Sequence, residues 1–157
     1  LIKDVKQMLS IPVIANGDID SPEKAKYVLD YTGADAIMIG RAAQGRPWIF
    51  REISHYLATG QHLAAPNIQE VKDVLLGHLS ELYEFYGEYS GCRISRKHIA
   101  WYTKGLRSSN EFRQNMYKVE STADQYKVVE AYFDDLLAQG EIMSDVQVEQ
   151  INLLETK

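Results

Sequence analysis

Short apolar runs alternate with amphipathic segments over the first 60 residues. The runs are rich in β-branched side chains and stop at polar or glycine residues, which is typical of buried parallel strands. The segments between them carry apolar residues at intervals of three and four, which predicts helices, and Ser21 with Pro22 is a typical helix start. In chain order we expect the end of a helix at 1–9, a strand at 10–15, a helix at 22–31, a strand at 34–39 and a helix from 47 to 59.

This β-α-β-α order predicts a parallel sheet with helical crossovers. Two strands cannot bury both faces of such a sheet, so the unit is incomplete by itself. The pattern fits the last two βα units of a (β/α)₈ barrel of the TIM type, a fold of about 250 residues. Because the sequence begins with leucine inside an apparent helix, we expect it to be the back portion of a longer protein.

From residue 67 onward the pattern is helical only, so the fold class is α/β followed by all-α. Asn67-Ile-Gln-Glu70 and Ser108-Ser-Asn-Glu111 have the form of a capping box, and Ser121 is a further N-cap. We expect helices from 67 to a break at Tyr89-Ser90-Gly91, from 92 to 104, from 108 to 117 and from 121 to 138. Short turns between four helices predict a small antiparallel bundle. The predicted domains are a barrel portion at 1–60, a linker at 61–66, a helical bundle at 67–140 and an acidic tail at 141–157.

Two glycine-containing loops follow the predicted strands, Asn16-Gly17-Asp18 after the first and Gly40-Arg41 after the second. Glycine lets the backbone approach a phosphate closely, and the N–H groups and dipole at a helix start favour an anion. Arg41 would add a charge-assisted hydrogen bond. The two loops resemble the phosphate grip that (β/α)₈ barrels make after their last two strands. An ordinary pair of βα turns explains the spacing equally well.

The composition, 45% hydrophobic and 25% charged, is that of a soluble globular protein. No apolar run reaches membrane-spanning length and no signal-peptide layout is present, so we expect a cytoplasmic protein. A single cysteine, Cys92, excludes an intramolecular disulfide and a cysteine-based metal cluster. His55, His62 and His78 lack the spacing of metal ligands, so no metal site is assigned.

The net charge of −5 argues against nucleic-acid binding, but the charge is unevenly distributed. Between Ser90 and Lys118 the only acid is Glu111, whereas residues 119–157 hold nine acids against two lysines. On an ideal helix Arg93, Lys97 and Lys104 lie within about 40° of one another. Arg96 lies about 60° to the other side of Arg93, and Ile94, His98, Trp101 and Tyr102 fall on the opposite half.

A basic stripe on a surface helix is typical of a polyanion site, although a solvated face balanced by the neighbouring acidic helix would have the same pattern. Trp101 and Tyr102 are better explained as core residues of the bundle than as platforms for base stacking. We interpret His98 as a packing residue. Cys92 opens the predicted second helix, where the dipole would lower its pKa, but no catalytic partner is near, so a structural role is expected.

Four segments together resemble the C-terminal part of bacterial tRNA-dihydrouridine synthases, most closely the B-type subfamily. They are Ile11-Pro-Val-Ile-Ala-Asn-Gly-Asp-Ile19, Gly33-Ala-Asp-Ala-Ile-Met-Ile-Gly-Arg-Ala42, Gly45-Arg-Pro-Trp48 and Arg96-Lys-His-Ile-Ala-Trp-Tyr102. The first two occur in other flavin-dependent barrels, whereas their combination with the last is specific. The resemblance covers about residues 1–138.

The resemblance implies an FMN enzyme that reduces the C5–C6 double bond of a uridine in tRNA, with NADPH as the hydride source. It implies that the FMN phosphate and ribityl chain are held by Asn16, Gly17, Asp18, Gly40 and Arg41. It also implies that the helical bundle binds tRNA, with Arg93, Arg96, Lys97, His98 and Lys104 as the contacting residues.

No catalytic residue is assigned in this chain. The family's general acid is a cysteine on an earlier barrel loop, a position that Cys92 does not match, so the resemblance implies that this chain alone has no synthase activity. Two other functions fit the residues: a non-catalytic RNA-binding module, and a phosphate-binding barrel enzyme of small-molecule metabolism. Self-association through the incomplete barrel edges is also expected.

Overall fold

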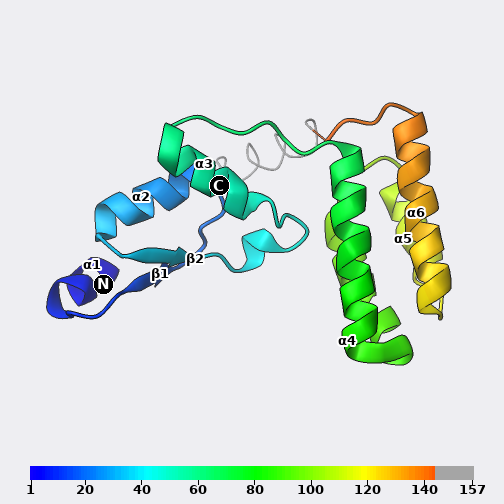
Figure 1. Cartoon of the computed structure of the whole chain (residues 1–157), viewed down its shortest axis with the longest axis horizontal. Coiled ribbons are helices and arrows are strands. Elements are labelled where there is room, and N and C mark those ends of the chain that lie inside the picture. Colours follow the sequence, from blue (N-terminus) through cyan, green and yellow to red (C-terminus); the bar gives the residue numbers. More distant parts are fainter. Residues whose placement is uncertain (144–157) are drawn as a thin grey trace. The chain divides into compact units, whose positions relative to one another are not determined.

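The computed structural model describes residues 1–143, and the chain divides into two compact units (Figure 1). The first unit comprises Leu1–Ala64 and the second begins at Ala65. Within the described residues, no helix combines the length and apolar character that crossing a membrane requires. Of the predicted acidic tail at 141–157, residues 144–157 lie outside the described residues.

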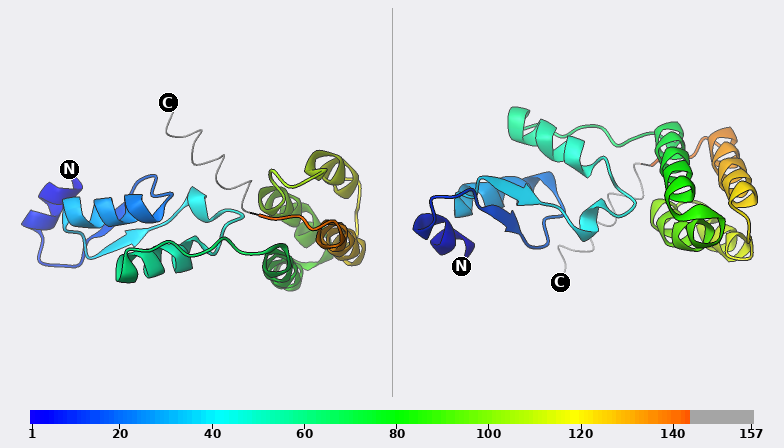
Figure 2. Two further views of the ribbon diagram at one scale, coloured as in Figure 1. Left: turned by 90° about the horizontal axis from the view of Figure 1, so that it is seen from above. Right: turned by 60° about the horizontal axis from the view of Figure 1, so that its bottom comes forward.

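The first unit contains a parallel two-stranded sheet, as predicted. Its elements are α1 (Ile2–Met8), β1 (Ile14–Asn16), α2 (Pro22–Thr32), β2 (Ala36–Met38), the 3₁₀ turn η1 (Arg41–Ala43) and α3 (Ile49–Thr59). The two strands lie side by side (Figure 2), and Ile14 pairs with Ala36, Ala15 with Ile37, and Asn16 with Met38. Both strands have three residues, fewer than the six predicted for each.

Only one face of this sheet is covered. Ala15 is fully buried, and Ile37 packs against a core formed by residues of α2 and α3 and of the loop before α2 (Ile19, Ala25, Ile49 and Ile53). Ile14 and Met38 point to the other face and remain more than half exposed. The crossover helix α2 begins as predicted, because the Ser21 hydroxyl accepts a hydrogen bond from the Lys24 N–H at 3.1 Å.

In the described part of the second unit, the regular secondary structure is entirely helical. Its helices are α4 (Ile68–Tyr102), α5 (Ser109–Met116) and α6 (Thr122–Ala138). The predicted break at Tyr89-Ser90-Gly91 is wrong, because those residues are helical and α4 turns back on itself at Gly87, which has φ 72° and ψ 180° (Figure 1). A left-handed φ of this kind is readily adopted only by glycine.

Gly91 serves the fold in another way. A Cβ atom at this position would lie 3.2 Å from the Tyr83 Cα atom and 3.3 Å from the Leu82 carbonyl oxygen. Farther from the turn, the rings of His78 and His98 lie 4.7 Å apart. The two halves of α4 therefore run back along each other, and Gly91 permits their close approach.

Side chains cap two of the three helices in this unit, α4 and α6, but not α5. Asn67 caps α4, accepting from the Glu70 N–H at 2.8 Å, and Ser121 caps α6, accepting from the Asp124 N–H at 3.0 Å, as predicted. The predicted capping box at Ser108 is wrong, because Ser108 has φ 52° and its side chain makes no cap bond. An N-cap needs extended backbone, whereas consecutive tight turns lead the chain into α5.

Helix α6 packs along α4 and joins its two halves. Along α6, three apolar residues are buried, Val129, Phe133 and Leu136. The side chain of Gln125 is fully buried, accepts from the Tyr83 hydroxyl at 2.8 Å, and donates to the Cys92 carbonyl at 3.1 Å. Because Tyr83 and Cys92 lie on opposite sides of Gly87, this amide stabilises the turn of α4.

Candidate functional site

The loops that follow β1 and β2 meet at the same edge of the sheet. The first contains Gly17, with φ 152°, and Asp18, with φ 44°, so this loop uses backbone that few side chains adopt. The Arg41 guanidinium donates to the Asp18 carboxylate at 2.5 Å. Of the five residues expected to bind FMN, the structure therefore joins Asp18 and Arg41 directly, and Asn16 donates to the Met38 sulfur across the strands at 3.2 Å.

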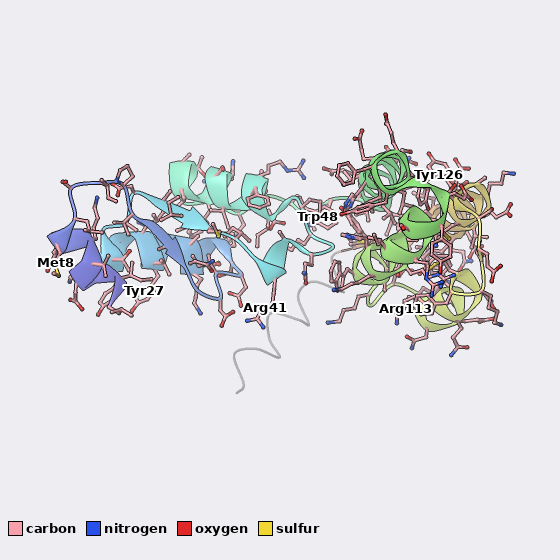
Figure 3. The ribbon with its side chains drawn as sticks, turned by 90° about the horizontal axis from the view of Figure 1, so that it is seen from below. Met8, Tyr27, Arg41, Trp48, Arg113 and Tyr126 are labelled. Atoms are coloured by element: carbon pink, nitrogen blue, oxygen red, sulfur yellow. The ribbon has the colours of Figure 1, made fainter. Side chains whose placement is uncertain are left out.

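This edge of the sheet is open around the glycines. A Cβ atom added at Gly17 or Gly40 would meet no atom within 4 Å, and the side chains of Arg41 and Asp18 are 82% and 75% exposed. Arg41 points outward from the ribbon in Figure 3. The loop after β2 leads into a single 3₁₀ turn at Arg41–Ala43, and the helix predicted from residue 47 begins at Ile49. An anion bound here would take Arg41 from Asp18, because both would compete for the same guanidinium.

Arg46 holds this edge together, a role that the sequence interpretation did not assign. Its guanidinium donates to the Glu52 carboxylate on α3 at 2.6 Å and to the Asp20 carbonyl at 3.3 Å. Glu52 is buried, with 7% of the residue exposed. Arg46 therefore ties the loop after β2 to the loop after β1. The signal was present in the Gly45-Arg-Pro-Trp48 segment, but its partners lie up to 26 residues away.

The predicted basic stripe lies on the second half of α4 and just beyond it. Arg93 and Lys97 are exposed on the helix, and Lys104 is exposed two residues after its end. Arg96 is only partly exposed and donates to the Val119 carbonyl at 2.8 Å. Arg96 thus joins α4 to the segment before α6, and three of the four cations face solvent.

Trp101 lies beside a cation of the stripe and not on the opposite half of the helix, so the prediction for Trp101 is wrong. The Arg93 guanidinium lies over the Tyr89 ring at 5.0 Å and donates to its hydroxyl at 2.7 Å. The Lys97 ammonium lies over the Trp101 ring at 4.9 Å. Tyr102, by contrast, is a core residue as predicted, with 5% exposed. Arg93 and Lys97 therefore each stack on an aromatic ring one helical turn away.

His98 packs between the halves of α4, as predicted. Its ring lies 4.7 Å from the His78 ring and 5.1 Å from the Trp101 ring. Burial lowers the pKa of both histidines, and the nearby His78 and Lys97 lower the pKa of His98 further. Both imidazoles are therefore mainly neutral at pH 7.

Cys92 lies inside α4 and not at a helix start, because the turn is at Gly87. Burial raises the pKa of its thiol, so the predicted lowering by the helix dipole is wrong. The thiol donates to the Val119 carbonyl at 3.6 Å, in keeping with the structural role that was expected. Across residues 1–143, histidine, cysteine and acidic side chains form no group of three or more that could hold a metal ion.

The amino-acid sequence of this chain is similar to those of known proteins. The sequence profile of the family described as "Dihydrouridine synthase (Dus)" matches residues 1–137. The chain is 59% identical to "tRNA-dihydrouridine synthase B" of Shewanella oneidensis over 136 residues, which are 87% of this chain and 42% of that protein. The protein of the same name from Serratia marcescens is 54% identical over 141 residues, 90% of this chain and again 42% of its own length. The chain thus spans less than half of these relatives, and it belongs to the dihydrouridine synthase family.

Proposed function

We propose that this chain is the C-terminal portion of a flavin-dependent tRNA-dihydrouridine synthase, which reduces uridine in tRNA to 5,6-dihydrouridine with FMN and NADPH. In this proposal the first unit supplies the last two βα units of a (β/α)₈ barrel and part of the FMN site. The second unit is an antiparallel helical bundle that binds tRNA. The observation that carries the proposal is the unpaired basic face of α4.

That face is not neutralised by the acidic helix beside it. Among the described residues, no carboxylate lies within 4.0 Å of the charged nitrogens of Arg93, Lys97 or Lys104. The acidic helix α6 instead forms an ion pair through Asp134 with Lys72 on the other half of α4, at 2.6 Å. A solvated face balanced by its neighbour would show such pairs, so cations without a carboxylate partner favour a polyanionic ligand.

The proposed contacts divide by exposure. Arg93, Lys97 and Lys104 bind phosphates of the tRNA backbone directly, because their charged groups reach solvent. Arg96 combines a contact to tRNA with its bond to Val119, which holds the segment before α6. His98 presents a neutral imidazole at neutral pH, so its proposed contribution is a hydrogen bond and not a charge.

A salt titration of tRNA binding tests this proposal. If the face makes about five phosphate contacts, log affinity falls with log salt with a slope of roughly −3.5 to −4.5. The Arg93→Glu/Lys97→Glu variant should lose most of the affinity and much of the slope. Lys24→Glu/Lys127→Glu, the same charge change at exposed lysines elsewhere, is the matched control. Equal binding by the wild type and Arg93→Glu/Lys97→Glu would exclude this face as the tRNA site.

At the sheet edge, the residues present fit one end of an FMN molecule. The open space at Gly17 and Gly40 admits a phosphate to the backbone, and Arg41 would pair with it. The Asp18 carboxylate and the Asn16 amide oxygen would accept hydrogen bonds from ribityl hydroxyls. When bound and reduced by NADPH, FMN would supply the hydride for uridine reduction.

Comparison of FMN with riboflavin tests the proposed role of Arg41. The two flavins differ only in the phosphate, so the wild-type chain should bind FMN more tightly, and Arg41→Ala should remove most of that preference while leaving riboflavin binding unchanged. Fluorescence titration measures both affinities. A preference for FMN that survives Arg41→Ala would place the phosphate elsewhere.

Cys92 does not have the properties of the missing general acid. Cys92 is buried among helices of the second unit and its pKa is raised, so it does not deliver a proton to a uracil ring. The chain alone is therefore expected to form no dihydrouridine when tRNA, FMN and NADPH are supplied. Mass spectrometry of nucleosides from the treated tRNA provides the readout.

A further inference from the structure

Four side chains recur at intervals of four residues along the second half of α4: Tyr89, Arg93, Lys97 and Trp101. We refer to them as the stacking ladder. We propose that the stacking ladder binds an unpaired segment of RNA, with a base on the Tyr89 ring and the adjacent phosphates on Arg93 and Lys97. This inference rests on the proposed function and specifies which part of the RNA the basic face takes.

The order of the ladder is aromatic, cation, cation, aromatic, and each cation already lies on a ring. Arg93 lies over Tyr89 at 5.0 Å and Lys97 over Trp101 at 4.9 Å. Arg93 and Lys97 are one helical turn apart, about 6 Å along the axis. Positive charges held beside aromatic rings are the combination that single-stranded nucleic acids use, because a base stacks on the ring and its phosphate meets the cation.

Tyr89 is accessible to a ligand. It is 73% exposed although it is a large aromatic residue on a helix that is otherwise packed, and Phe85, four residues earlier, is 80% exposed. Phe85 and Tyr89 therefore lie on either side of the turn of α4 at Gly87. Exposed apolar side chains that lie together often mark a binding surface.

The charge near Tyr89 favours a nucleotide over an acidic or purely apolar partner. Glu88 is the only acid between residues 88 and 110, and its carboxylate accepts from the Thr122 N–H at 2.8 Å and the Thr122 hydroxyl at 2.5 Å. Its negative charge is thus engaged at the start of α6. Among the described residues, Arg93 and Lys97 form no ion pair with a carboxylate.

A paired helix is a poor occupant of this surface, because its bases are stacked on one another and their faces are covered. An unpaired nucleotide in a loop exposes a base face, which every base possesses, so the ladder should tolerate different base sequences. The proposed ligand is therefore unpaired RNA, and duplex RNA is the comparison in the binding experiment.

The test measures binding of the full chain to an oligouridylate strand and to a blunt RNA duplex of the same length. Tyr89→Leu should weaken oligouridylate binding by roughly tenfold, since stacking on an aromatic residue contributes about that much per base, and should change duplex binding by less than twofold. Tyr89→Phe keeps the ring and loses only the hydroxyl bond to Arg93, so it should bind like the wild type. Tyr27→Leu removes a similarly exposed tyrosine of the first unit and serves as the control.

The salt dependence separates this inference from the proposed function. Tyr89→Leu should leave the slope of log affinity against log salt unchanged, because tyrosine neutralises no phosphate. If Arg93→Glu/Lys97→Glu abolishes binding while Tyr89→Leu binds both RNAs as the wild type does, the phosphate contacts stand and the stacking ladder is refuted. Equal weakening on the strand and the duplex, or no binding of oligouridylate by the wild type, would also refute it.

Discussion

At the scale of single residues, surroundings decide the chemistry of the two packed histidines. His78 and His98 face each other across the turn of α4, and burial holds the pKa of each below the ordinary value of 6.5. Unfolding releases them to that ordinary value, so the unfolded chain binds more protons once the pH falls below it. The free energy of unfolding should therefore decrease as the pH drops through 6.5.

Thermal melts at pH 7.5 and 5.5 measure this effect. The wild type should melt at a lower temperature at pH 5.5, and His78→Gln/His98→Gln should remove much of the difference because glutamine does not titrate. The carboxylates of Glu88 and Asp35, whose pKa values are lowered in the fold, begin to matter only near or below their ordinary values of 4.5 and 3.8. An unchanged difference in the double variant would contradict the assignment.

Residue roles could be predicted from the sequence where the partner is close along the chain. The caps at Ser21, Asn67 and Ser121 bond to the N–H three residues later, and all were predicted. The partners of Arg46 and Arg96 lie in distant segments brought near by folding. A single sequence does not give those distances, so Arg46 received no role and Arg96 was placed with the exposed cations.

At the scale of elements, α4 illustrates two uses of glycine that look alike in the sequence. Gly87 supplies a left-handed φ for the turn, whereas Gly91 supplies room for Tyr83. The sequence pattern favoured the Tyr89-Ser90-Gly91 stretch as the break, two to four residues too late. The existence of two helical segments was predictable from the apolar spacing, but the turn position depends on how the segments pack.

Alanine substitutions distinguish Gly91 from Gly77, a glycine of α4 that has no close neighbour. Gly91→Ala should destabilise the protein by about 1–3 kcal/mol, because its Cβ would press on backbone atoms of residues 82 and 83. Gly77→Ala, also inside α4, meets no atom within 4 Å and should stabilise it by about 0.5–1 kcal/mol through helix propensity. Urea unfolding monitored by circular dichroism gives both values. A neutral Gly91→Ala would show that the halves of α4 can separate at little cost.

The two strands show the same limit on prediction from sequence. Their existence and parallel pairing followed from the apolar runs at 10–15 and 34–39. Their lengths did not, because only Ile14–Asn16 and Ala36–Met38 find partners, and the sheet has no further strand among the described residues. Likewise the loops were placed correctly at one edge, while the Arg41–Asp18 ion pair required the structure.

At the scale of the whole molecule, the uncovered face of the sheet predicts self-association. Ile14 and Met38 are 57% and 52% exposed, and the strands carry unpaired edges. Sedimentation velocity should show oligomers that increase with concentration, and Ile14→Lys/Met38→Lys should shift the chain toward monomer. Tyr27→Lys/Phe50→Lys changes equally exposed groups on α2 and α3 and is the control. If the control disperses the oligomers as well as the strand variant does, general surface hydrophobicity is the cause.

The burial of Cys92 has a consequence for chemical labelling. The thiolate is the reactive form of cysteine, and this thiol is 1% exposed with a raised pKa, so alkylating dyes should modify it slowly at neutral pH. It is the chain's only cysteine. A second cysteine introduced at an exposed position such as Lys127→Cys would therefore take up a fluorophore selectively, without replacement of the native thiol.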